Sequence, residues 1–423
     1  MATPSTPTAA KSPTVPPRSV LRDLTFLRLW AGTTASGLAT WALPFVLGLA
    51  VLHHDLGAAG LGLVLAARTV GFLVAVAVGG VLADRHSRRA VVRWSALAAA
   101  VAAPLLAAGL DRSLVLMTAA AALAGAGQGA CRPAFQALTA ETVAPDQRRQ
   151  ANAAMTMAVR SSTLAGPALT ALLAAFLDVW SLLLGIGLLW VVAALVPGKG
   201  KATYTAADPA AEPGPRPGFR AEFLEGIREA RRHPWFLAGL SALVAVIALG
   251  YSATSVALPL ISRDRYGTEW VLAAAMTAYT VGALCGALMI ARHRPRSQGW
   301  AAFAGLAAYG VAPLSLMLPV HPVVVVAAYA VAGIGIELFN VPWFTATQRE
   351  VAPDKLARVS SLDFLVSYGL APVGLALIAP AIDAFGVTPV LAVCAAACFL
   401  VPAAAALVSS SRHFARTAPP TAD

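Results

Sequence analysis

The residues of this chain that could do chemistry are ionisable side chains within long apolar runs. Arg68, Arg132 and Arg160 lie within or near the ends of three such runs. Glu337 lies well inside a fourth run, and Asn340 follows it at a spacing that puts both on one helix face. A charge at membrane depth costs roughly 2.5 to 3.5 kcal/mol on insertion scales, which makes each group a candidate functional residue.

We predict that Glu337 lines a polar cavity with Asn340 and the arginines. Glu337 would either be neutralised by an arginine or carry a proton through a raised pKa. The alternative is a structural Arg–Glu pair that only fixes helix packing.

A second group of charges follows the apolar run 61–83. The stretch Gly80-Val81-Leu82-Ala83-Asp84-Arg85-His86-Ser87-Arg88-Arg89 ends that run, and a further apolar run begins at Ala96. Twenty apolar residues at about 1.5 Å each are long enough to cross a bilayer as a helix. We interpret the charged stretch as a short loop between two membrane-spanning helices that faces the cytoplasm.

The composition indicates an integral membrane protein. Of the 423 residues, 58% are hydrophobic and 12% are charged, whereas about a quarter of the residues of a soluble domain are charged. Helical spans are predicted in two sets of six, so the expected fold class is an all-α membrane protein with twelve transmembrane helices. The predicted spans are 28–52, 61–83, 91–110, 114–138, 151–177, 180–197, 236–261, 271–291, 300–320, 323–346, 362–384 and 389–409.

The distribution of charge sets the expected orientation. The net charge is +11, which could indicate a nucleic-acid partner, but the 31 Lys and Arg residues lie mostly at the termini and in even-numbered loops. Only Arg112, Arg263 and Arg265 fall in odd-numbered loops. This is the positive-inside pattern of a multi-pass protein of the cell inner membrane with both termini in the cytoplasm, and it argues against nucleic acid.

Composition also predicts the domain boundaries. We expect a disordered cytoplasmic tail over 1–26, six-helix bundles over 27–197 and 235–411, a cytoplasmic linker over 198–234 and a cytoplasmic tail over 412–423. Within the linker, four prolines indicate a flexible segment up to residue 217. Residues 219–232 alternate apolar and charged positions at helical spacing, which predicts an amphipathic helix on the inner membrane surface.

An internal repeat supports two similar halves. Val143-Ala144-Pro145-Asp146 recurs as Val351-Ala352-Pro353-Asp354, and the Gly125/Gly127 pattern recurs at Gly333/Gly335, both 208 residues later. The same displacement pairs Asn340 with Arg132. Parallel repeats of this kind place a substrate site between the halves near the midplane.

The pattern Gly-x-x-x-Asp-Arg-x-x-Arg-Arg from Gly80 to Arg89 resembles the signature loop of the major facilitator superfamily, with Ser87 in place of a glycine. The segments 26–32 and 348–353 are similar to the branch that contains the enterobactin exporter and drug-efflux permeases. The resemblance implies a gate formed by Gly80, Asp84, Arg85, Arg88, Arg89 and Glu141. Asp84 would lie near the start of a helix in the other half, and Arg88 would pair with Glu141; the alternative is that these charges only set topology.

In the second half, the segment Gly286-Ala287-Leu288-Met289-Ile290 puts Ile290 opposite Asp84, so we expect an asymmetric gate. Gly166 and Pro167 resemble the superfamily's antiporter motif, but helix packing is an equal alternative. The family's drug-exporter arginine is replaced by Ala121. Spans one, four, seven and ten line the cavity in this family, which adds Gln128, Tyr251, Trp343 and Trp41 to the cavity candidates.

The resemblance implies a secondary active transporter, driven by the proton gradient without a cofactor, that exports a small amphiphilic compound such as a drug, antibiotic or siderophore-like metabolite. Uptake of a metabolite by the same fold is the alternative, and a lipid flippase or a non-transporting membrane protein is a further one. The motifs of metalloproteases, serine hydrolases and ATP-driven pumps are absent from the sequence, so we expect no enzyme and no metal site. The expected partners are a small-molecule substrate and membrane lipid, and we expect a monomer.

Overall fold

The computed structural model describes residues 19–198, 218–268, 270–293 and 295–415, and every regular element within these ranges is helical. The predicted all-α fold class is confirmed. Six helices make up what we call the N half: α1 (Leu24–Leu52), α2 (Ala58–Arg85), α3 (Arg88–Gly109), α4 (Leu114–Thr142), α5 (Arg148–Leu173) and α6 (Val179–Leu195).

The C half also consists of six membrane-length rods, two of which change helix type partway. A π-helical turn at Val246–Tyr251 joins α8 (Pro234–Ala245) to α9 (Ser252–Asp264), and a 3₁₀ turn at Ala308–Gly310 joins α11 (Gln298–Ala307) to α12 (Val311–Met317). The other rods are α10 (Trp270–Arg292), α13 (Pro322–Glu350), α14 (Leu356–Phe385) and α15 (Val387–Ala406).

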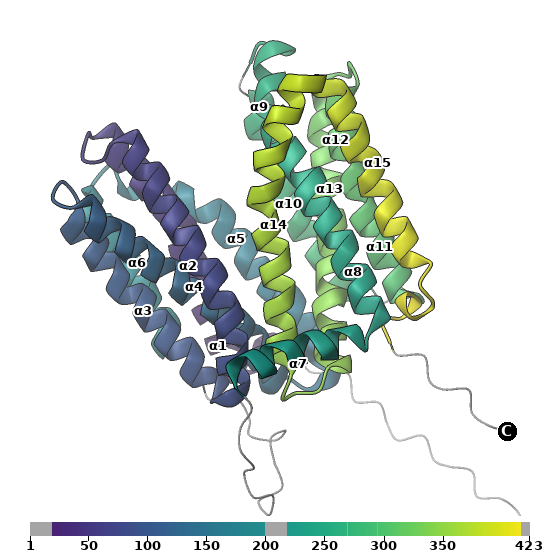
Figure 1. The fold of residues 1–423 in the computed structure, drawn as a ribbon, viewed down its shortest axis with the longest axis horizontal. Helices are drawn as coiled ribbons and strands as arrows, with labels where there is room; N and C mark the ends of the chain where they lie inside the picture. The colour runs from purple at the N-terminus through teal and green to yellow at the C-terminus, as the bar shows by residue number, and fades with distance from the viewer. Residues whose placement is uncertain (1–18, 199–217, 269, 294, 416–423) are drawn as a thin grey trace, which may run out of the picture.

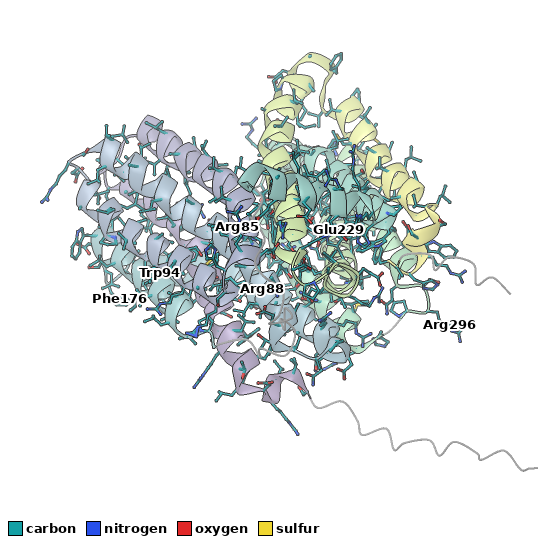
Figure 2. All side chains as sticks on the ribbon, turned by 60° about the horizontal axis from the view of Figure 1, so that its bottom comes forward. Arg85, Arg88, Trp94, Phe176, Glu229 and Arg296 are labelled. Atoms are coloured by element: carbon teal, nitrogen blue, oxygen red, sulfur yellow. The ribbon has the colours of Figure 1, made fainter. Side chains whose placement is uncertain are left out.

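Length and composition suit these rods to a bilayer. Within the described residues, ten helical stretches are long and apolar enough to cross a membrane. The other two rods are α6, which is shorter, and α5, whose first turns carry Arg148, Arg149 and Asn152. Large apolar side chains such as Trp94 (65% exposed) and Phe176 (80% exposed) point outward (Figure 2), as lipid-facing side chains do.

The two halves meet at one end and diverge toward the other (Figure 1). Helix α7 (Phe219–Arg231) lies across the end at which they meet, and we call this the α7 end. Every hydrogen bond found between described residues of the two halves lies between this end and the middle of the helices. The C half keeps its own core around Trp235, Phe236 and Trp343, which are fully buried.

Small residues let two helix pairs approach to backbone contact. A Cβ placed on Gly125 of α4 would lie 1.9 Å from the carbonyl oxygen of Arg68 on α2, and one on Gly333 of α13 would lie 2.0 Å from that of Tyr279 on α10. The reciprocal contacts are Gly71 against Ala122 and Gly282 against Ala330. Only glycine fits at such approaches, so α2–α4 and α10–α13 are equivalent pairs.

These contacts fix the register of the repeat and correct one prediction. Gly125 and Gly333 are 208 residues apart, but Gly71 and Gly282 are 211 apart. Pro295 rather than Ile290 is therefore the counterpart of Asp84, although the expected lack of an acid at that position still holds. By the same register, Tyr279 is the counterpart of Arg68.

The structure also corrects the expected tails. Val20 is buried, a 3₁₀ turn covers Val20–Arg22 and α1 begins at Leu24, so the disordered tail predicted over 1–26 is too long. At the other terminus, Phe414 is buried against Trp235 and Phe303, so the tail predicted from residue 412 begins later. Residues 1–18, 199–217 and 416–423, which hold the rest of the predicted tails and flexible linker, lie outside the described residues.

Candidate functional site: a closed end and a polar floor

Asp84 of α2 caps the start of α14 in the other half. Its carboxylate accepts hydrogen bonds from the backbone N–H groups of Ala357 (3.2 Å) and Arg358 (3.0 Å), and from the Arg358 side chain (3.0 Å). Orphan N–H groups and the positive end of a helix dipole both favour a carboxylate here. Gly80 allows this approach, because a Cβ there would lie 2.6 Å from the Cβ of Ser361.

Arg88 joins three segments at the same end. Its guanidinium lies 2.6 Å from the carboxylate of Glu141 on α4, and it also donates to the carbonyl of Pro353 in the C half. Arg88 is 6% exposed, so this pair is shielded from solvent far more than a surface salt bridge. The predicted contact between Arg88 and Glu141 is thus present, and Arg89 lies half-buried beside it at the start of α3.

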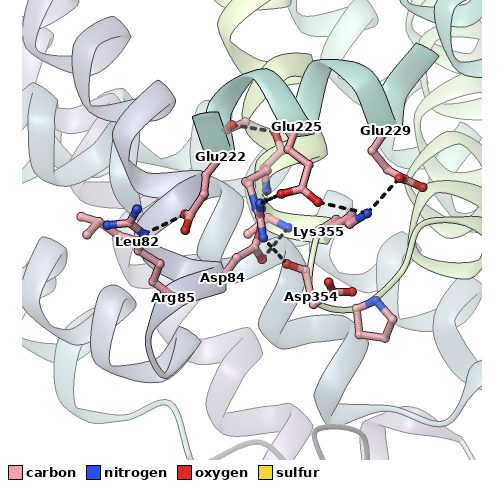
Figure 3. A network of polar contacts seen from close by, with 12 residues as sticks. Leu82, Asp84, Arg85, Glu222, Glu225, Glu229, Asp354 and Lys355 are labelled. Carbon is pink, nitrogen blue, oxygen red and sulfur yellow. Dashed lines mark hydrogen bonds and ion pairs between the residues drawn. The ribbon is translucent and has the colours of Figure 1, made fainter. Parts of the chain in front are cut away.

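Helix α7 clamps this junction with acids on its inner face (Figure 3). Glu222 pairs with Arg85 of the N half at 2.7 Å, while Glu225 pairs with Arg358 at 3.0 Å. Glu229 pairs with Lys355 at 3.2 Å. Arg85, Arg88 and Glu229 all lie near the seam of the two halves in the view from this end (Figure 2).

The predicted amphipathic helix is present, but its inner face also carries acids. Glu222, Gly226, Glu229 and Ala230 are its buried positions, whereas Leu224, predicted on the apolar face, is 47% exposed. Ion pairs to the protein therefore help hold α7 at this end, beside the half-buried Phe223 and Ile227.

Two of these glutamates have lowered pKa values. Burial alone would raise the pKa of Glu225, but the hydrogen bond from Lys355 and the charges of Arg358 and Lys355 outweigh it and hold the pKa below its usual range. The same balance, dominated by Lys355, lowers the pKa of Glu229. Both carboxylates are therefore ionised at neutral pH.

An amide layer lies further in. Asn152 of α5 donates to the hydroxyl of Thr345 (3.0 Å) and to the side-chain oxygen of Gln348 (2.9 Å) on α13. Gln348 donates in turn to the side-chain oxygen of Gln136 on α4 (3.2 Å). Since all three amides are satisfied across the seam, this layer joins the halves without charge.

The predicted pairing of Glu337 with an arginine is present at the centre. A guanidinium nitrogen of Arg160 lies 2.6 Å from the Glu337 carboxylate, and Asn340 donates to the same carboxylate at 3.4 Å. Glu337 is 1% exposed, whereas the Arg160 side chain is 23% exposed. Arg160 also lies 5.9 Å above the ring of Tyr279.

A second bridge lies beside the first. Arg132 donates to the hydroxyl of Tyr368 on α14 at 2.8 Å and stacks on its ring at 4.9 Å. Arg68 donates to the side-chain oxygen of Gln128 (2.8 Å) and to the carbonyl of Thr40 (3.1 Å). The structure thus joins Arg68 to Gln128 in the N half and connects Arg132 and Arg160 with the C half.

These contacts form successive layers from the α7 end inward. Arg160 is twelve residues beyond Arg148, the first residue of α5, which at 1.5 Å per residue places it about 18 Å from that end. Beyond the Arg132 and Arg160 bridges, no hydrogen bond joins the described residues of the two halves, which diverge there (Figure 1). We call these two bridges, the contacts between the halves that lie farthest from the α7 end, the floor.

Gly166 and Pro167 lie away from this floor, where α5 packs on α1. A Cβ on Gly166 would lie 3.1 Å from the Cβ of Trp41, and Gly37 approaches Ser162 one turn earlier. The helix continues through Pro167. This geometry supplies a packing role for the stretch, and Trp41 contributes its backbone and Cβ to it while its side chain is 38% exposed.

Trp343 was predicted in the cavity, and this is wrong. Its ring is fully buried in the C half, stacked on Phe236 (4.7 Å) and Phe339 (5.3 Å). Its indole N–H donates to Asp363 at 3.3 Å. Trp343 was a candidate because the tenth span lines the cavity in the family, but its ring packs among the aromatic side chains of the C half core. Tyr251, by contrast, is 40% exposed.

Several site residues were missed by sequence reasoning. Tyr279 and Tyr368 carried no signal, because a tyrosine in an apolar helix is ordinary packing material. The α7 acids at i, i+3 and i+7 did carry one, since that spacing puts Glu222, Glu225 and Glu229 on one face.

Comparisons with known proteins agree with this architecture. The sequence model of the Major Facilitator Superfamily matches residues 29–374. The structure resembles the human organic anion transporter MFSD10 (TETRAN) with a TM-score of 0.69 at 17% identity, covering 92% of this chain and 100% of that one.

It also resembles a bacterial homologue of the iron transporter ferroportin in the outward-facing state. With soaked iron, the TM-score is 0.70 at 15% identity, over 90% of this chain and 98% of that one. Without iron, it is 0.69 at 18% identity over the same shares. No curated protein sequence matches this chain.

Proposed function

Because the chain belongs to the major facilitator superfamily and is a multi-pass membrane transporter rather than an enzyme, we propose that it exports a small amphiphilic organic compound by alternating access, driven by the proton gradient. The compound would be a drug, an antibiotic or a siderophore-like metabolite. The observation that carries this proposal is the sealed α7 end above which the halves diverge (Figure 1).

The orientation follows from charge. Arg85, Arg88 and Arg89 lie at the α7 end, as do most lysines and arginines of the loops. By the positive-inside rule this end faces the cytoplasm of the cell inner membrane. The structure then corresponds to an outward-facing state, closed to the cytoplasm by Asp84, Arg88 and α7.

Closure must be reversible for transport. Hydrogen bonds to charged groups contribute about 1.5–3 kcal/mol each, so the few that cross the seam at Asp84 and Arg88 stabilise this state by an amount that a substrate or proton can offset. The Asp84 gate is asymmetric, since Pro295 takes the equivalent place in the C half, and near it Arg149 donates to the backbone carbonyl of His293 (3.1 Å).

Glu337 is our candidate for proton coupling. It is the acid of the floor, and its partner Arg160 belongs to the other half. Protonation would remove the ion pair that joins the halves at this depth, which links proton binding to opening of the cytoplasmic side.

The test is accumulation of fluorescent amphiphiles, both anionic and cationic, in cells that express the wild type, Glu337→Gln or Asp84→Asn. We expect the wild type to lower accumulation several-fold and a protonophore or either substitution to abolish the effect. Unchanged accumulation across the panel would contradict export of amphiphiles. Higher accumulation in expressing cells would instead identify an importer.

A further inference from the structure

The floor distributes charge unequally between the two halves. With the register fixed by the glycine contacts, Arg68 corresponds to Tyr279. The 208-residue displacement of the loop repeat pairs Arg132 with Asn340 and Arg160 with Tyr368. At three equivalent positions, the N half therefore has a guanidinium and the C half has a neutral hydrogen-bonding side chain.

Two of the three arginines lack a counter-charge. Among the described residues, Arg68 donates only to a carbonyl and an amide oxygen, and Arg132 donates to a tyrosine hydroxyl. Charges held at membrane depth are normally paired, so the floor with its single Glu337 has an excess of positive charge.

The C half adds a small tyrosine pocket next to these charges, with a volume of about 20 Å³, which is room for about one water molecule. Its lining consists of Tyr251, Thr254, Ser255, Met276, Tyr279, Tyr309 and Tyr329. Tyr279 belongs both to the pocket and to the ring face beneath Arg160. Thr254 Oγ1 lies 3.1 Å from the hydroxyl of Tyr309, whereas the Tyr329 hydroxyl, in a side chain only 3% exposed, makes no hydrogen bond of normal length.

The π-helical turn shapes one wall of the pocket. It ends at Tyr251, and Ser252 donates to the carbonyl of Ile247 across it (3.2 Å). Such single π-turns are frequent at functional sites, because they leave backbone out of register with the following helix. The pocket is too small to enclose an aromatic ring, so the arginines of the floor are the groups that can hold a ligand.

Building on the proposed transport function, we propose that the substrate is an organic anion, such as a carboxylate or sulfonate. Arg68 and Arg132 of the N half would bind the acidic group, because neither has a counter-charge among the described residues. Arg160 becomes a third ligand when the anion replaces Glu337 on it. Because Arg132 and Arg160 also make the contacts with the C half at this depth, binding of the anion competes with contacts that join the halves.

The experiment measures binding to the purified full-length protein in detergent with three naphthalene derivatives of one shape: the 2-carboxylate, the 2-carboxamide and the 2-methylammonium. We expect the carboxylate to bind at least about tenfold more tightly than the other two, the minimum that one charge-assisted contact supplies. Arg68→Gln and Arg132→Gln should each weaken carboxylate binding about tenfold, and Arg132→Lys should restore part of it.

Glu337→Gln tests whether Arg160 can bind the ligand or only holds the helices together. If Arg160 binds the ligand, the substitution should tighten carboxylate binding, because it frees Arg160 from its ion pair. Arg263→Gln is the matched control, since Arg263 pairs with the exposed Asp264 at the opposite end and should leave binding unchanged. Size-exclusion profiles and thermal unfolding identify any variant that fails to fold. If an Arg→Gln variant fails to fold, carboxylate binding is measured on the Arg→Lys variant at the same position instead.

Equal binding of the carboxylate and the ammonium, or unchanged carboxylate binding in both Arg→Gln variants, would overturn the proposal. Chloride competing as well as the carboxylate would show that the arginines bind any small anion, and would overturn an organic substrate. If the carboxylate binds as expected but no compound is transported, the transport function fails and the anion site stands. If only neutral or cationic compounds are transported, transport stands and the anion site fails.

Discussion

At the scale of single residues, Asp84 holds the α7 end closed through more contacts than a simple pair would supply. It accepts from two backbone N–H groups and one guanidinium of the opposite half. An asparagine would keep the shape but lose the charge on which these bonds depend.

We therefore expect Asp84→Asn to weaken closure by about 1.5–3 kcal/mol. The measurement replaces Ser361, which is fully buried against Gly80, with cysteine in a variant that lacks the four native cysteines. Weaker closure should then appear as faster labelling of this cysteine by a maleimide. Labelling should rise about tenfold or more. Arg263→Gln should leave the rate unchanged, and an equal rise in that control would show that the assay reports general loosening.

Sequence reasoning identified the site residues whose charge is energetically costly inside a membrane, and it missed site residues that carry no such cost. Glu337, Arg132 and Arg160 were identified because charge within an apolar run requires an explanation. Tyr279 and Tyr368 were missed, since their role comes from the arginine that each faces across the seam. Only the three-dimensional register reveals that.

At the scale of elements, the glycine-mediated contact of α2 with α4 sets the shape of the N half. A methyl group on Gly125 would lie 1.9 Å from a backbone carbonyl that cannot move without shifting α2. On α6, by contrast, Gly185 is exposed and has nothing within 4 Å of a new Cβ.

Gly125→Ala should accordingly destabilise the protein by about 1–3 kcal/mol, as overpacking does. Gly185→Ala should be neutral or stabilising by up to about 1 kcal/mol, because alanine favours helix. Thermal unfolding of the purified variants measures both. Equal melting temperatures would mean that α2 and α4 are not in backbone contact.

The docking of α7 has a defined pH dependence. The folded-state pKa values of Glu225 and Glu229 lie below the ordinary value of 4.5, so their contribution is fully present above pH 4.5 and is lost as the pH falls through the lowered values. Hydrogen exchange of the α7 amides, corrected for intrinsic rates, should show constant protection from pH 8 to 5 and loss of protection below. Loss of protection between pH 7 and 5 would contradict these ion pairs.

Helix positions were largely predictable from hydropathy, and element type was predictable throughout. The orientation of α7 was not, because its apolar spacing favoured a lipid-facing helix while the acids found basic partners from two distant segments, at Arg85 and at Lys355 and Arg358. Long-range charge pairing overrode local amphipathicity. The predicted boundaries of the two terminal tails were wrong for a similar reason, because tertiary contacts bury Val20 and Phe414.

At the scale of the whole molecule, two similar halves are joined at one end by layered polar contacts and diverge toward the other (Figure 1). The internal repeat predicted two similar halves, but the sequence alone does not predict which end of the molecule is closed. That asymmetry comes from the contacts that join the halves on the side of the α7 end, such as those of Asp84 and Glu337. Alternating access requires these contacts to break when the opposite end closes.

The most direct test measures two distances between spin labels in one protein. One pair, Phe176→Cys with Phe385→Cys, reports the diverging end, where both side chains are exposed (80% and 73%). The other pair, Trp94→Cys with Arg296→Cys, reports the α7 end (Figure 2). On introducing Asp84→Asn, we expect the first distance to shorten and the second to lengthen. A longer second distance with an unchanged first would mean that the halves merely loosen, and would contradict alternating access.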